Sequence, residues 1–137
     1  MFTYQTKIHL HDTDAAGRLF FANQLRLVHD AYEALLETIS FGFQDLIREY
    51  DFFLPIVQCE SEYKKPLFVG DVIEIQIKVA KIGQTSFVFA YEIFNAAGDL
   101  VGTAKTVHVT VSDKTGEKIP LPDLMREKIR ELYAQDN

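Results

Sequence analysis

The segment His11 to Gly17, with the sequence HDTDAAG, holds the residue types best suited to chemistry in this chain of 137 residues. Its aspartates, Asp12 and Asp14, lie between a short alternating segment and a long helical pattern. A carboxylate facing a helix N-terminus lies near free backbone N–H groups, which together with the helix dipole stabilise a developing oxyanion. This arrangement suits acyl transfer. The structural alternative is that the aspartates cap a helix or order a turn.

Other titratable residues have simpler interpretations. Glu33 lies on the long helical pattern, where an exposed charged surface is the ordinary role of a glutamate. His9, His11 and His108 lack the spacing of a zinc motif such as HExxH, so we predict no metal and no cofactor. Cys59 lies in a strand pattern with no base near it in the sequence, and we expect a buried, inert thiol.

The elements that must position the HDTDAAG segment follow from hydrophobic periodicity. Alternating residues predict a strand from Phe2 to Leu10, and apolar residues three and four apart predict a long helix over 20–39. A short helix over 44–50 follows. Four strands then precede a terminal helix over 123–134, with strand patterns centred on residues 53–65, 73–79, 87–93 and 101–111.

This order of elements predicts an α+β fold. A parallel Rossmann sheet is excluded because helices and strands do not alternate, and the last three strands form an antiparallel meander. The long helix is apolar over too wide an arc for a surface helix, so we expect the sheet to curve around it. The length fits a single domain, 1–137.

Composition excludes several classes of partner. Fourteen Lys and Arg against twenty Asp and Glu give a net charge of −6, which argues against nucleic acid. No apolar run approaches the roughly 20 residues that span a bilayer, so we expect no membrane partner. A single cysteine cannot form an intrachain disulfide, and the N-terminal sequence shows no secretory pattern. These observations favour the cytoplasm.

Two motifs resemble those of the hotdog-fold thioesterases in the 4-hydroxybenzoyl-CoA thioesterase-like family. DTDAAG, followed by Phe20-Phe21 and VHDAYEALL, is similar to the D-x-D-x-x-G signature and central helix, and PLFVGD at 66–71 is similar to the P-x-x-x-G-D turn. The resemblance implies an antiparallel sheet wrapped around one long central helix. It also implies hydrolysis of an acyl-CoA thioester to free acid and CoA, in a homodimer or homotetramer.

The resemblance assigns roles to particular residues. Asp14 matches the catalytic carboxylate, which acts as nucleophile or as the base for water, and Gly17 matches the loop glycine. Phe21 matches the position whose backbone N–H polarises the thioester carbonyl. His29 and the segment DFFLP at 51–55 are similar to the branch that hydrolyses dihydroxynaphthoyl-CoA. Arg18 and His29 depart from the usual family residues, and both bear on acyl specificity.

Several roles stay open at this point. Arg18, Lys64 and Lys65 could bind CoA phosphates locally despite the net charge. Glu33 is the alternative catalytic carboxylate, as in a second hotdog branch. A hydratase or dehydratase, in which His29 moves the proton, is a second class of function. A third is a non-enzymatic module that binds an apolar ligand or a partner protein.

Overall fold

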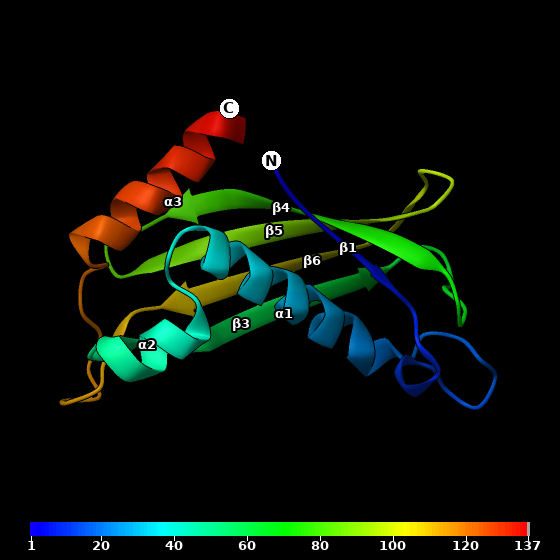
Figure 1. Cartoon of the computed structure of the whole chain (residues 1–137), viewed down its shortest axis with the longest axis horizontal. Coiled ribbons are helices and arrows are strands. Elements are labelled where there is room, and N and C mark those ends of the chain that lie inside the picture. The colour runs from blue at the N-terminus through cyan, green and yellow to red at the C-terminus, as the bar shows by residue number, and fades with distance from the viewer. Residues whose placement is uncertain (137) are drawn as a thin grey trace.

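A five-stranded antiparallel sheet in the order β1-β4-β5-β6-β3 forms one layer of the structure (Figure 1). The computed structural model describes residues 1–136. The shorter strands pair in a separate two-stranded sheet, β2 (Phe52–Phe53) with β7 (Val111–Ser112). The main strands are β1 (Phe2–Lys7), β3 (Ile56–Tyr63), β4 (Val72–Ile82), β5 (Ser86–Asn95) and β6 (Leu100–Val109).

The long helix α1 (Phe21–Thr38) crosses one face of this sheet, and the short helix α2 (Phe43–Glu49) follows it (Figure 1). Helix α3 (Asp123–Asp136) packs against β4. A 3-10 turn, η1 (Leu10–Asp12), joins β1 to the loop before α1. The predicted α+β hotdog architecture is confirmed. Among residues 1–136, each helix is either too short or too polar to cross a bilayer.

The core lies between α1 and the concave face of the sheet. Residues one helical turn apart on α1 are buried, and alternate residues of β4 and β5 face them. These spacings follow from the helical period of about 3.6 residues and the strand period of about 2. Fully burying an apolar side chain contributes roughly 1.5–3 kcal/mol, so this contact fixes α1 along its length. The buried residues on the three elements include Leu27, Val28, Ala31, Tyr32, Leu35, Ile73, Ile75, Ile77, Phe87, Phe89, Tyr91 and Ile93.

Two expectations, one about the end of the first strand and one about Cys59, are wrong. Strand β1 ends at Lys7, and Leu10, expected on its core face, is 75% exposed. The Asp12 carboxylate accepts the His9 N–H at 2.8 Å, and such local bonds compete with a strand ladder. The strand predicted over 53–65 is observed as β3, which begins at Ile56, directly after Pro55, and lies at an edge of the sheet. Cys59 is exposed rather than buried because β3 is an edge strand.

A polar chain runs through the core behind α1. The Tyr91 hydroxyl lies 2.8 Å from Thr106 Oγ1, which lies 2.7 Å from His108 Nε2. The imidazole of His108 stacks on Phe87 and lies beside Tyr32. Burial, with a smaller contribution from His29, lowers the pKa of His108 to about 3. His108 is therefore a neutral core residue at physiological pH.

We expect acid to destabilise the fold through His108. Below the ordinary histidine pKa of about 6.5, the unfolded chain gains a proton that the folded protein does not accept until about pH 3. Above pH 6.5 both states are neutral at this site. The free energy of unfolding should therefore fall by about 1.4 kcal/mol per pH unit, or about 2 kcal/mol at pH 5.

Urea denaturation of the wild type and His108→Gln at pH 7.5 and pH 5 measures this effect. Glutamine does not titrate, and its side chain can still reach Thr106. The free energy of unfolding of the wild type should fall by about 2 kcal/mol relative to that of His108→Gln on acidification, because every other titratable group is the same in the two proteins. An equal pH dependence in the two proteins would contradict the assignment.

Candidate active site

The loop that carries Asp14 is closed by its own backbone. The Asp14 N–H donates to the Arg18 carbonyl at 2.8 Å, and the Gly17 N–H donates to the Asp14 carbonyl at 3.0 Å. Gly17 has a φ of +75°, a left-handed conformation that glycine adopts without strain. The sequence places its loop glycine where the turn requires one.

The Asp14 carboxylate is oriented through one oxygen. Oδ1 accepts the N–H groups of Ala16 at 2.8 Å and Arg18 at 3.2 Å. Within residues 1–136, no donor is bonded to Oδ2. The carboxylate does order its turn, as the structural alternative requires, yet one oxygen is left for a substrate or water.

The start of α1 has no side-chain cap. Phe20 is the N-cap residue and makes no capping bond, and its N–H donates to the Asp12 carbonyl at 3.0 Å. Phe21 is the first helical residue, 65% exposed, and its N–H has no acceptor in the part of the chain that the structure describes. Of the two structural roles open to the aspartates, capping of α1 is not observed, whereas Asp14 does order its turn. Free N–H groups at a helix N-terminus favour an anion.

Asp12 is buried and connects η1 to α1. Its carboxylate pairs with Arg26, which also bonds to Asp30 at 3.2 Å. Its carbonyl accepts the Asn23 side-chain amide at 3.0 Å in addition to the Phe20 N–H. Asp12 therefore holds the N-terminus of α1 in place near Asp14.

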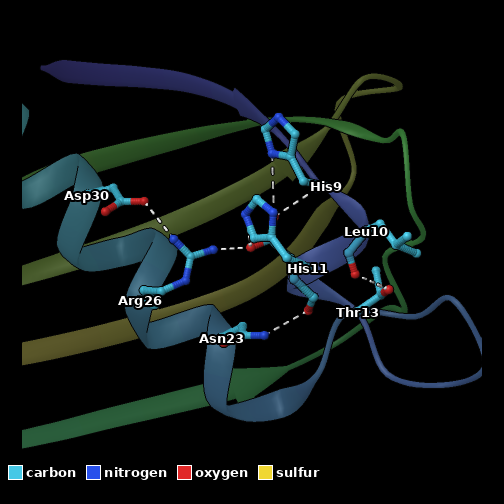
Figure 2. Close-up of polar contacts among 8 residues, drawn as sticks. His9, Leu10, His11, Thr13, Asn23, Arg26 and Asp30 are labelled. Carbon is cyan, nitrogen blue, oxygen red and sulfur yellow. Dashed lines mark hydrogen bonds and ion pairs between the residues drawn. The ribbon is translucent and has the colours of Figure 1, made fainter.

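The structure brings two of the histidines together, contrary to the expectation from their spacing. The rings of His9 and His11 stack in parallel, with nitrogens 3.6 and 3.5 Å from the Asp12 oxygens (Figure 2). The potential ligand atoms of His9, His11 and Asp12 lie within 4.8 Å of one another, close enough to hold a metal ion. The Arg26 guanidinium already neutralises this carboxylate, so a divalent ion would meet a fixed positive charge. We therefore interpret the cluster of His9, His11 and Asp12 as structural rather than as a metal site.

The two motifs of the sequence meet at the Asp14 loop. The Leu19 N–H donates to the Leu67 carbonyl at 2.8 Å, and the Val69 N–H donates to the Gly17 carbonyl at 3.0 Å. The PLFVGD and DTDAAG segments therefore lie side by side and contribute residues to the same site. A cleft of about 340 Å³ lies there, and the predicted residues that line it are Asp14, Arg18, Phe21, Lys64 and Lys65.

Sequence reasoning missed two residues of this cleft. The Tyr63 hydroxyl donates to the Phe21 carbonyl at 2.5 Å, and the buried Gln24 amide donates to Ser61 Oγ and to the Glu62 carbonyl, both at 2.9 Å. These bonds fix the first turn of α1 against β3. The sequence does contain an indication that Gln24 has a special role, because it is a polar residue on the apolar stripe of the helix.

The cations around the cleft are exposed and already paired. Lys65 Nζ lies 3.3 Å from Asp99, and this bond lowers the pKa of the Asp99 carboxyl. Lys64 Nζ lies 3.5 Å from Glu62, and the Arg18 guanidinium lies 5.5 Å from the centre of the Phe68 ring. Exposed ion pairs contribute little, so these side chains can exchange partners for a phosphate.

Two predicted residues lie outside the cleft. His29 Nδ1 is 3.1 Å from Glu33 Oε1, and both side chains are about half exposed, two to three turns along α1 from Phe21. Neither lines the Asp14 cleft. His29 instead lines a second cavity beside β3. The structure therefore does not bring the alternative carboxylate Glu33 together with Asp14.

Comparison with known proteins identifies the family. Residues 8–129 match the model of the thioesterase-like superfamily. The chain is 37% identical to a 1,4-dihydroxy-2-naphthoyl-CoA hydrolase of Microcystis aeruginosa, covering 90% of this chain and 88% of the relative. The structure of a 1,4-dihydroxy-2-naphthoyl-CoA thioesterase from Synechocystis superposes with a TM-score of 0.89 at 32% identity, covering 96% of both chains. This chain therefore belongs to the thioesterase-like superfamily and is a hotdog-fold thioester hydrolase.

Proposed function

We propose that this protein hydrolyses an aromatic acyl-CoA to the free acid and CoA, with 1,4-dihydroxy-2-naphthoyl-CoA as its substrate. The observation that carries the proposal is that Asp14 and Phe21 line one cleft, and that the Phe21 N–H at the start of α1 has no acceptor within residues 1–136. The names of the relatives from Microcystis aeruginosa and Synechocystis support the acyl group.

The geometry supports a division of roles for thioester cleavage. The Phe21 N–H binds the carbonyl oxygen as negative charge develops on it. As a base, Asp14 takes a proton from the water that attacks the carbonyl carbon; as a nucleophile, it forms an anhydride that water then cleaves. In either route the C–S bond breaks, CoA leaves as the thiolate, and the thiolate is protonated by the proton that the attacking water gives up. Gly17 shapes the loop, while Arg18, Lys64 and Lys65 bind the phosphates of CoA, and His29 contacts the acyl group.

A panel of acyl-CoA substrates with a free-thiol assay tests the proposal. We expect kcat/KM to be higher for 1,4-dihydroxy-2-naphthoyl-CoA and 4-hydroxybenzoyl-CoA than for palmitoyl-CoA, because a flat pocket suits rings. A preference for palmitoyl-CoA would move the protein to fatty-acyl substrates. Modification of an enoyl-CoA without release of CoA would instead indicate a hydratase.

The proposal includes a homodimer or homotetramer. Strand β3 lies at one edge of the sheet and, within residues 1–136, pairs with β6 on one side only, with Ile56, Val57 and Tyr63 exposed along it. Long exposed edges with apolar side chains invite pairing with another chain. We expect light scattering at micromolar concentration to give at least twice the monomer mass of 15.7 kDa. A monomer that retains thioesterase activity would refute the assembly.

We also propose that residues 1–137 act as a single domain in the cytoplasm, with acyl-CoA rather than nucleic acid or membrane as the partner. The exposed free thiol of Cys59 supports a reducing compartment. The net charge of −6 supports the exclusion of nucleic acid.

A further inference from the structure

The first turn of α1 is held mainly by polar contacts. Phe21 is 65% exposed, and Gln24, at 2%, is the first buried residue of the helix. The fully buried apolar residues of α1 begin at Leu27. The place of the Phe21 N–H therefore depends on the hydrogen bonds that the first turn makes with its neighbours.

The Gln24 amide bonds to two groups of strand β3. Its nitrogen donates to Ser61 Oγ and to the Glu62 carbonyl, each at 2.9 Å. These bonds use both amide hydrogens, and a carbonyl oxygen can only accept, so the orientation of the amide is fixed. A shift of the amide would leave a buried donor and a buried acceptor without partners, which is costly.

Strand β6 leaves space for this amide at Gly102. Gly102 is buried and pairs with Tyr63 of β3. A Cβ at this position would lie 2.9 Å from both Nε2 and Oε1 of Gln24 and 3.0 Å from the Glu62 carbonyl oxygen. The backbone of Gly102 is not left-handed, so the glycine serves the close approach of the amide rather than a turn.

The same turn of α1 is bonded at two further points. The Tyr63 hydroxyl donates to the Phe21 carbonyl at 2.5 Å. The Phe20 N–H donates to the Asp12 carbonyl at 3.0 Å, so the loop before the helix holds the other side. Gln24 lies three residues after Phe21, one turn along the helix. Strand β3 and the Asp12 loop together therefore fix where the Phe21 N–H lies.

We propose that Gln24 is a positioning residue for thioester hydrolysis, because its bonds to β3 set the place of the Phe21 N–H relative to Asp14. The inference rests on the proposed function, in which this N–H binds the developing oxyanion. A donor stabilises the oxyanion only within hydrogen-bond distance, and a misplacement of about 1 Å can lower the rate by about 10²-fold. The bond strengthens in the transition state, so its loss lowers kcat more than it changes KM.

Gln24→Leu tests the role of the amide, since leucine fills a similar volume and makes neither bond to β3. With the thioester that the wild type hydrolyses fastest, we expect kcat to fall roughly tenfold and KM to stay within about threefold. Gln58→Leu is the matched control, because Gln58 is exposed on the same strand and lies outside the Asp14 cleft. Thermal melts show whether both variants fold.

The decisive measurement repeats Gln24→Leu in a Phe21→Pro background. Proline at the first position of a helix is tolerated and removes the N–H that Gln24 positions. Gln24→Leu should then lower kcat by less than about twofold, because no donor is left to misplace. A merely structural role of Gln24 would lower kcat by the same factor in both backgrounds, and that result would overturn the inference.

Ser61→Ala is the second variant, which serves if Gln24→Leu does not fold. It removes one of the two bonds and keeps the bond to the Glu62 carbonyl. We expect kcat to fall about threefold in the wild-type background and to stay unchanged with Phe21→Pro. Unchanged kcat in folded Gln24→Leu and Ser61→Ala would overturn the inference and leave the proposed function intact. Hydrolysis of aliphatic thioesters alone would overturn the proposed substrate, and the comparison of the two backgrounds would still decide the role of Gln24.

Discussion

Asp14→Asn should lower kcat by at least about 10²-fold and change KM far less, because the carboxylate acts on the reacting atoms in the transition state. Asparagine keeps the shape of the side chain, and its carbonyl oxygen can still accept the N–H groups of Ala16 and Arg18. The melting temperature should therefore shift by only a few degrees. A free-thiol assay with an aromatic acyl-CoA and a thermal melt measure the two quantities.

The matched control is Glu33→Gln, the same chemical change at the alternative carboxylate. Glu33 is about half exposed, pairs with His29, and does not line the cleft of Asp14. Its substitution should leave kcat within roughly tenfold of the wild type. If Asp14→Asn were active and Glu33→Gln inactive, the catalytic role would pass to the helix and the loop aspartate would only order its turn.

Local patterns predicted most of the fold. The alternation in β4 and β5 and the wide apolar stripe of α1 are direct consequences of burial on one face, so these elements could be recognised without tertiary information. Leu10 shows where the pattern misleads. It continues the alternation of β1, but the bond between the His9 N–H and the Asp12 carboxylate turns the chain away from the sheet.

The residues that local patterns could not predict depend on contacts between distant segments. The exposure of Cys59 follows from the place of β3 at the sheet edge, which strand order decides. Tyr63 reaches Phe21 across 42 positions of sequence, and no local spacing encodes that bond. The pairing of DTDAAG with PLFVGD was predicted as co-occurrence of motifs, whereas their hydrogen bonds are visible only in the fold.

Phe21→Pro should lower kcat by about 10²- to 10³-fold, the usual cost of losing one oxyanion donor. Proline removes the N–H at residue 21 together with the exposed Phe21 ring, and the loss of the ring alone is measured by a separate variant. Phe21 is the first residue of α1, where proline is well tolerated, and Phe20 has φ −71° and ψ 132°, the conformation that a following proline favours. The carbonyl that accepts the Tyr63 hydroxyl is retained.

Phe21→Ala separates the backbone from the side chain. It removes the exposed ring and keeps the N–H, so kcat should stay within about tenfold of the wild type. Circular dichroism and thermal melts of both variants check that α1 still begins at residue 21. Full activity in a folded Phe21→Pro would mean that another donor binds the oxyanion. The N-terminus of α1 would then have a structural role, in which Gln24 bonds to β3 and shapes the cleft beside Asp14.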